Sequence, residues 1–175
     1  MVSDIERVAP LPPSQWPPEL EKIRQNLGNP LNIHNMMAHN TALTRAWMPL
    51  RNYLVANSSL APKDRELLIL RTALNCDTAY EWEHHVVRGR EAGLADEEIQ
   101  RVKQGPTASQ WPPASRLLLQ AADDCFRDSE ISDDTYPELS LHFDVQQQLD
   151  IIATVGMYMT LAAIIKTYRV PMENS

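Results

Sequence analysis

The sequence predicts an all-α protein of about seven to nine helices. Apolar residues recur at intervals of three and four along most of the chain, whereas the alternation of two that is typical of strands is scarce. Only five glycines interrupt this pattern in 175 residues. Helix-end signals agree with it, because Pro62 suits a first helical turn and Gly93 followed by Leu94 suits a C-terminal cap.

Nine helical segments are expected in chain order, with ends placed to within about 2 to 4 residues. They cover residues 18–27, 31–38, 41–56, 62–74, 78–92, 96–103, 111–127, 132–139 and 143–167. The third should kink at Pro49, since a proline inside a helix removes one backbone hydrogen bond. Thr78-x-x-Glu81 has the spacing of a capping box, in which two side chains cap the start of their own helix.

Chain length indicates one folded domain with an N-terminal arm. Residues 1–17 are rich in proline and are expected to be extended, and residues 18–175 are expected to form a single helical domain. Residues 105–113 are the best internal linker, between a first and a second helical group. The second group carries more apolar surface than a lone pair of helices buries, so we expect a homo-oligomer.

Charge and cysteine content restrict the partners and the compartment. A formal net charge of −7 without a basic run argues against nucleic acid. Cys76 and Cys125 form no CxxC pair, which fits a reducing compartment. The N-terminus lacks the apolar core of a signal peptide, and residues 151–165, the longest apolar stretch, are too short to cross a bilayer. We therefore expect a cytoplasmic protein with no membrane partner.

A glutamate lies in the middle of an apolar helix face. In a projection of the helix 62–74 at 100° per residue, Glu66 is flanked by Ile69, Leu70 and Ala73. Most of the charged residues of that helix lie on the opposite side. A carboxylate in this position must be paired, hydrogen-bonded or shifted in pKa, because an unpaired buried charge is costly.

The next helix carries a histidine on its apolar stripe. In the same projection of the helix 78–92, His85 lies close to Glu81 and Thr78. The opposite side is assigned to Glu83, His84, Arg88, Arg90 and Glu91. Because a short turn joins the two helices, Glu66, Glu81, His85 and Thr78 are expected to converge in one partly buried pocket.

Structural explanations compete with a functional one. A lone core histidine is more often a satisfied structural group than a catalyst, and Glu81 stands where a capping box places its glutamate. Glu66 and His85 together favour a function, because two such groups on facing apolar stripes set each other's pKa values. A solvent-filled gap between them would indicate catalysis, and a dry direct contact would indicate structure. No metal is expected, since Glu81 and His85 would need further ligands.

Three stretches resemble the carboxymuconolactone decarboxylase and alkylhydroperoxidase AhpD-like family. They are LAPKDRELLILRTALN, then YEWEHHVVRGREAGL with the following ADEEI, and the C-terminal LDIIATVGMYMTLAAIIKTYRVP, which is similar to the family's last helix. The resemblance covers roughly residues 30–170. It implies an AhpD-like helical fold, and members of the decarboxylase branch are homo-oligomers, often trimers or hexamers, so a dimer, trimer or hexamer is expected.

The resemblance also implies a site. The peroxidase branch has a glutamate, a CxxC pair and a histidine four residues after the second cysteine, which fall by position on Glu66, on Thr78 and Glu81, and on His85. Both cysteines are missing, so thiol peroxidase chemistry is not expected. The decarboxylase branch uses no cofactor and is similar in having a glutamate and a histidine four residues apart, as Glu81 and His85 are.

The resulting hypothesis is a cofactor-independent acid/base lyase that acts on a small oxygenated ring or lactone acid, as a decarboxylase, a dehydratase or an isomerase. His85 is the candidate general acid or base, Glu66 orients it, and Glu81 carries a second proton. The residues expected to contact the substrate are Thr78, Tyr80, Trp82 and His39. The alternatives are a non-catalytic oligomeric scaffold of the same fold and a residual alkylhydroperoxidase-type oxidoreductase.

Overall fold

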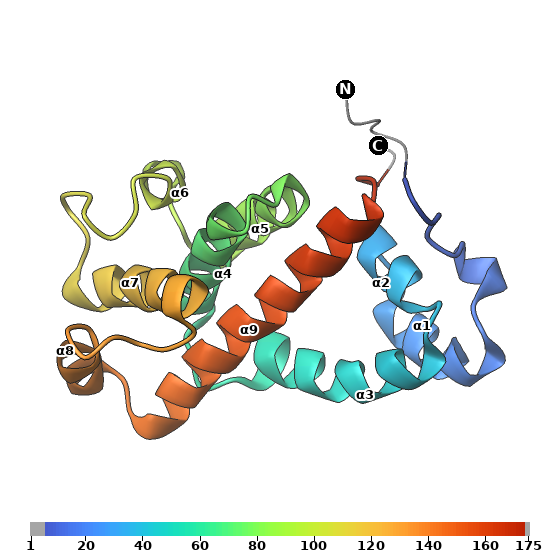
Figure 1. The fold of residues 1–175 in the computed structure, drawn as a ribbon, viewed down its shortest axis with the longest axis horizontal. Helices are drawn as coiled ribbons and strands as arrows, with labels where there is room; N and C mark the ends of the chain where they lie inside the picture. The colour runs from blue at the N-terminus through green and yellow to red at the C-terminus, as the bar shows by residue number, and fades with distance from the viewer. Residues whose placement is uncertain (1–5, 174–175) are drawn as a thin grey trace. The chain divides into compact units, whose positions relative to one another are not determined.

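The computed structural model describes residues 6–173, and within that range it is helical, without strands (Figure 1). The predicted all-α class is therefore confirmed. The helices of the described residues are α1 (Glu21–Leu27), α2 (Asn32–Met37), α3 (Thr41–Asn52), α4 (Pro62–Asn75), α5 (Ala79–Glu91), α6 (Asp96–Val102), α7 (Pro113–Asp128), α8 (Tyr136–His142) and α9 (Val145–Tyr168).

Several helix ends lie where the local signals predict them. Pro62 occupies the first turn of α4. Beyond α5, Gly93 adopts a φ of 94°, and the Leu94 backbone N–H donates to the carbonyl oxygen of Gly89 at 2.8 Å, which closes the helix. Pro49 lies inside α3, and the end of the expected segment 41–56 is a separate π-helical turn, Tyr53–Asn57.

One local prediction was wrong, and one helix start lies at the limit of its expected margin. Thr78 precedes α5 but its side chain makes no capping hydrogen bond, and neither carboxylate oxygen of Glu81 has a hydrogen-bond partner among the described residues, so there is no capping box. Helix α8 begins at residue 136 rather than 132. The hydroxyls of Ser132 and Thr135 instead donate to Asp124, and Pro137 occupies the first turn of the helix that follows.

The chain divides into two compact units. The first is Asn57–Ala162, and the second combines Met1–Ala56 with Ala163–Ser175. Residues 105–113, expected to be a linker, lie inside the first of these units. Trp111 explains this, because its ring is buried and its Nε1 donates to the carbonyl oxygen of Gly105 at 3.1 Å. The single domain expected over residues 18–175 stays a prediction.

Helix α4 is the centre of the unit Asn57–Ala162 and packs on α5, α6 and α7. Leu67 and Leu70 join a cluster with α6 and Trp111, whereas Leu68 joins a second cluster with α7, α8 and α9. The guanidinium of Arg71 ties α4 to α7 by donating to both carboxylate oxygens of Asp123, at 2.6 and 2.8 Å. A polar group on the apolar faces of α4 is therefore buried.

The unit Met1–Ala56 with Ala163–Ser175 has its own small core around Trp16, Leu20 and Ala38. The indole N–H of Trp16 donates to Asn35 at 3.1 Å, and the backbone of Leu11 donates to the Asn35 carbonyl oxygen at 3.1 Å. The described part of the predicted N-terminal arm is thus held against α2, and it contains a 3-10 turn at Pro13–Gln15. Residues 1–5 of that arm lie outside the described residues.

Helix α9 has 24 residues and is longer than its apolar run. By length and composition alone it is the one helix of residues 6–173 that could cross a membrane, but half of its apolar window is buried inside the protein. Core helices of soluble proteins meet the same criterion. Ile151 and Val155 are buried in the core, whereas Leu149 and Ile152 are 62% and 47% exposed.

Candidate functional site

Glu66 on α4 and His85 on α5 meet in the interior of the unit Asn57–Ala162. The imidazole Nδ1 lies 2.6 Å from Glu66 Oε2, and both residues are 4% exposed. The other carboxylate oxygen of Glu66 lies 3.5 Å from Arg65 Nε. On α9, the Tyr158 ring meets His85 edge-on, with ring centroids 5.0 Å apart. The contact between Glu66 and His85 is direct.

Arg88 fixes the protonation of the imidazole. Its Nη1 lies 3.3 Å from His85 Nε2, and a guanidinium can only donate. Nε2 must then be the unprotonated nitrogen, and Nδ1–H donates to Glu66. Burial lowers the pKa of His85 below its ordinary value, and the neighbouring charges of Arg88 and His84 add to that effect, while the hydrogen bond and charge of Glu66 oppose it. His85 is neutral and offers a lone pair at Nε2.

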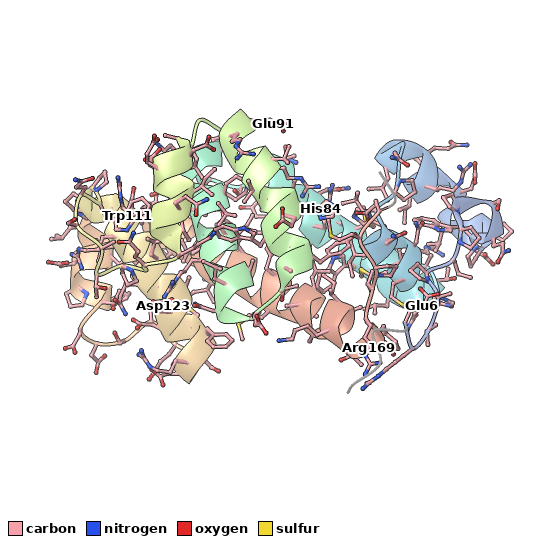
Figure 2. All side chains as sticks on the ribbon, turned by 90° about the horizontal axis from the view of Figure 1, so that it is seen from above. Glu6, His84, Glu91, Trp111, Asp123 and Arg169 are labelled. Carbon is pink, nitrogen blue, oxygen red and sulfur yellow. The ribbon has the colours of Figure 1, made fainter. Side chains whose placement is uncertain are left out.

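Glu81 is the anomalous residue of the site. It lies one helical turn before His85 on α5 (the helix that carries the labels His84 and Glu91 in Figure 2), is 4% exposed, and both of its oxygens lack a partner among the described residues. Burial raises the pKa of Glu81 to about 8. At neutral pH it is a protonated carboxylic acid, so a proton donor stands one turn from a lone pair.

The other expected residues of α5 have structural contacts. Trp82 packs against the cluster of Leu67 and Leu70, and the Lys103 ammonium lies 5.2 Å from the centre of its ring. Tyr80 is buried with its ring 4.5 Å from that of His84. A part for either ring in substrate binding stays a prediction.

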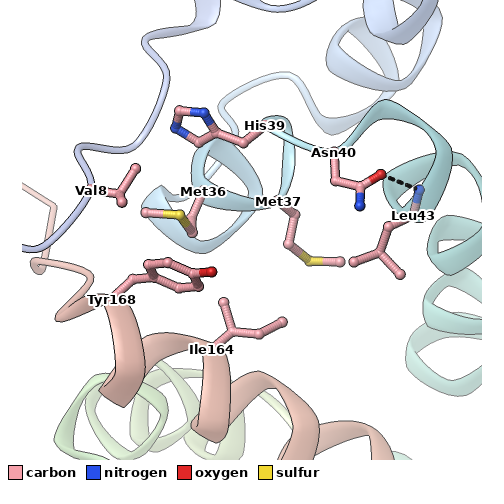
Figure 3. Close-up of a pocket in the computed structure, with 8 residues that line it drawn as sticks. All are labelled: Val8, Met36, Met37, His39, Asn40, Leu43, Ile164 and Tyr168. Carbon is pink, nitrogen blue, oxygen red and sulfur yellow. Dashed lines mark hydrogen bonds between the residues drawn. The ribbon is translucent and has the colours of Figure 1, made fainter.

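Thr78 and His39 complete the expected set. Thr78 is buried, with its hydroxyl 3.4 Å from the Cys76 carbonyl oxygen. His39 belongs to the unit Met1–Ala56 with Ala163–Ser175, whereas Glu66, Glu81 and His85 belong to the unit Asn57–Ala162. It lines a cavity of about 340 Å³ with Met36, Met37 and Tyr168 (Figure 3), and its Nε2 donates to the Ala9 carbonyl oxygen at 2.9 Å. Its role in the site stays a prediction.

Arg88 and Tyr158 were missed by the sequence analysis. Arg88 had been assigned to the face opposite Glu81, but it follows Glu81 by seven residues, about two full turns, and so lies on the same face. The spacing could therefore have identified it. Tyr158 comes from a distant helix, and no local pattern points to its contact with His85.

Metal and thiol chemistry have few candidate groups. Among residues 6–173, no three histidine, cysteine, aspartate or glutamate side chains form a group that could hold a metal ion. Cys76 and Cys125 form no disulfide, and burial raises the pKa of the Cys125 thiol to about 11, with the charge of Asp124 adding to it. Neither cysteine occupies a position next to His85 on α5.

Comparisons with solved structures support the fold. A peroxidase-related protein of Ralstonia eutropha with an alkylhydroperoxidase AhpD core superposes with a TM-score of 0.81 at 18% identity, covering 97% of this chain and 93% of that one. A peroxidase-related protein of Silicibacter gives a TM-score of 0.81 at 18% identity, with 99% and 96% covered. The debrominase Bmp8, whose cysteine-to-alanine variant was solved with 2,3,4-tribromopyrrole, gives 0.80 at 17% identity, with 97% and 92% covered.

These likenesses establish the AhpD-like helical fold that the sequence predicted, and at this level of identity they establish the fold alone. No curated protein matches the sequence. The carboxymuconolactone decarboxylase family profile matches residues 41–124, the stretch that contains Glu66, Glu81 and His85. In residues 41–124, the chain is therefore similar to the carboxymuconolactone decarboxylase family.

Proposed function

We propose that the protein is a cofactor-independent acid/base lyase that acts on a small oxygenated ring or lactone acid, with decarboxylation, dehydration and isomerisation as the related reactions. The single observation that carries this proposal is Glu81, a buried carboxylic acid without a hydrogen-bond partner among the described residues. It stands one turn from His85, whose Nε2 carries a lone pair. Acid/base sites combine two groups whose surroundings push their pKa values apart.

Glu81 is the proton donor in this proposal. Its pKa of about 8 keeps it protonated at neutral pH, yet close enough to neutrality to release the proton readily. His85 is the proton acceptor. Once Nε2 takes a proton, the imidazolium is stabilised by the Glu66 carboxylate, 2.6 Å from Nδ1.

The same groups serve each candidate reaction. In a decarboxylation, the bond to the carboxyl carbon breaks, CO₂ leaves, and the electron pair moves into a conjugated carbonyl as an enolate. Glu81 then donates its proton to carbon and regains one from solvent. In a dehydration or an isomerisation, His85 Nε2 first removes a proton beside the carbonyl, and Glu81 protonates the departing hydroxyl or the new carbon position.

The direct contact between Glu66 and His85 favours a structural role for that pair, as in a non-catalytic scaffold. A dry contact at 2.6 Å, completed by Arg65 and Arg88, satisfies both side chains and needs no substrate to explain it. A non-catalytic scaffold would therefore retain Glu66 and His85. It would have no use for Glu81, which is buried at a cost and bonded to no described group.

Turnover of carboxylated lactones tests the proposal, with CO₂ release and incorporation of deuterium from D₂O into the product as readouts. Glu81→Gln, His85→Ala and Glu66→Gln should each lower turnover about 10²-fold or more, the usual scale for loss of a general acid or base. Glu83→Gln is the matched control, because Glu83 is exposed on the same helix. A folded Glu81→Gln protein with full activity would rule out Glu81 as the acid.

A further inference from the structure

Arg88 differs from most arginines of the unit Asn57–Ala162 because it has no acidic partner within residues 6–173. Arg65 lies 3.5 Å from Glu66. Arg101 also has no acidic partner among the described residues, but it donates to the Gln110 side chain at 3.1 Å and lies over the Trp111 ring. Arg71, Arg90, Arg116 and Arg127 each contact an aspartate or a glutamate at 3.2 Å or less. Arg88 has no such partner among the described residues. It donates to His85 Nε2 at 3.3 Å, a long hydrogen bond, which leaves most of its five N–H donors unused.

A half-buried guanidinium in this position attracts an anion. The chain has 23 acidic residues, yet none of the described ones is paired with Arg88. Glu66, which shares His85 with Arg88, is already engaged by Arg65 and His85. Planar carboxylates fit a guanidinium with two parallel hydrogen bonds, which are stronger than a single long bond to a ring nitrogen.

We propose that Arg88 is the docking group for a carboxylate or enolate oxygen of the substrate, and that its movement onto this anion uncovers His85 Nε2 as the base. This inference rests on the proposed function and names the substrate class of the same site, a small organic anion. It also gives an order of events. Without an anion Arg88 occupies the lone pair of Nε2, and with an anion bound the lone pair becomes available to a carbon-bound proton.

The proton transfer that follows is balanced within the site. The C–H bond next to the carbonyl breaks, its electron pair forms the enolate, and the proton moves to Nε2. The negative charge that develops on the enolate oxygen is stabilised by Arg88, and the positive charge on the imidazole is stabilised by Glu66. The groups facing the imidazole are Glu66 from α4, Arg88 and His84 from α5, and the Tyr158 ring from α9.

Binding of benzoate, measured by calorimetry and by the ¹⁵N NMR signal of His85 Nε2, tests the proposal with neutral benzamide as the control ligand. Benzoate should bind to the full-length protein at millimolar concentrations or below and shift the Nε2 signal, whereas benzamide should do neither. Arg88→Gln should weaken benzoate binding about tenfold or more. It should also raise the pKa of His85, because the neighbouring positive charge is gone. Arg90→Gln is the matched control, since Arg90 lies on the same helix and pairs with Asp96.

The outcomes separate this inference from the proposed function. Absence of benzoate binding, or equal binding by the Arg88→Gln protein, overturns the docking role and leaves the activity test of Glu81 and His85 unaffected. Benzoate binding that depends on Arg88, combined with full activity of Glu81→Gln and His85→Ala, supports an anion site and overturns the acid/base function. An unchanged Nε2 signal on benzoate binding overturns the uncovering of the base.

Discussion

Replacing Glu81 by glutamine should stabilise the protein, and the gain should grow with pH. In the unfolded chain the carboxyl ionises near its ordinary pKa of 4.5, whereas in the folded protein it keeps its proton until about pH 8. Between these values the unfolded state binds fewer protons, so the free energy of unfolding falls as pH rises. Above about pH 8 both states are ionised and the loss is constant. Glutamine has the same shape and does not titrate.

The size of the effect follows from the two pKa values. The interval from 4.5 to about 8 corresponds to a cost of up to about 5 kcal/mol at alkaline pH. For a chain of this length, each kcal/mol moves the melting temperature by about 2 to 4 °C. The Glu81→Gln protein should therefore melt close to the parent below about pH 4.5 and about 10 °C or more above it beyond about pH 8.

Circular dichroism melts across this pH range provide the measurement. Glu83→Gln is the control, because Glu83 is exposed on the same helix and its replacement should leave the pH dependence unchanged. Parallel curves for the parent and the Glu81→Gln protein would refute the reasoning, since they would mean that Glu81 has a partner or is hydrated in solution. Measured together with turnover, the melts should show a more stable and less active protein.

Three further predictions concern other parts of the molecule. Asp124→Asn should destabilise the protein by about 1 to 3 kcal/mol, because Asp124 accepts hydrogen bonds from Thr135 at 2.6 Å and Ser132 at 2.7 Å. These hydrogen bonds outweigh the effect of burial and lower the pKa of Asp124 to about 2. In acid melts, the parent should therefore lose this stability as pH falls from about 3.8 to 2, whereas the variant should not. Both the parent and the double variant Cys76→Ser, Cys125→Ser should show negligible hydroperoxidase activity in an assay with a dithiol reductant. Hydroperoxidase turnover by the parent that disappears in the double variant would contradict this. Light scattering should give a multiple of the 19.9 kDa chain mass, because the exposed apolar side chains of α9 suit a contact between copies; a mass near one chain would be evidence against it.

The helices could be predicted well because their signals are local. Pro62 and Gly93 mark their own helix ends, and the three-to-four spacing of Ile69, Leu70 and Ala73 marks the buried face of α4. The contact between Glu66 and His85 followed from the same logic, since both lie on apolar faces of consecutive helices that pack together. Their roles in a reaction stay predictions.

The departures from the expected local structure have causes outside the local sequence. Helix α8 starts at residue 136, at the limit of the margin expected around residue 132, because Ser132 and Thr135 bind Asp124 on α7, a contact that no spacing within residues 132–139 encodes. Thr78 and Glu81 have the spacing of a capping box, but the Glu81 side chain is buried and does not cap the start of α5. A short motif specifies which hydrogen bonds can form, and packing decides which of them do.

Glu81 supports a catalytic function more strongly than Glu66 and His85 do. Glu66 and His85 satisfy each other, and breaking such a buried pair destabilises a fold whether or not it catalyses anything. Loss of stability in His85→Ala would therefore fit both explanations. The Glu81 side chain makes no hydrogen bond to the described residues and costs several kcal/mol at alkaline pH, a large share of the roughly 5 to 15 kcal/mol that stabilises a typical domain. If the Glu81→Gln protein is more stable but inactive, Glu81 is retained for its proton in catalysis. If it is more stable and fully active, Glu81 is not the catalytic acid of the site.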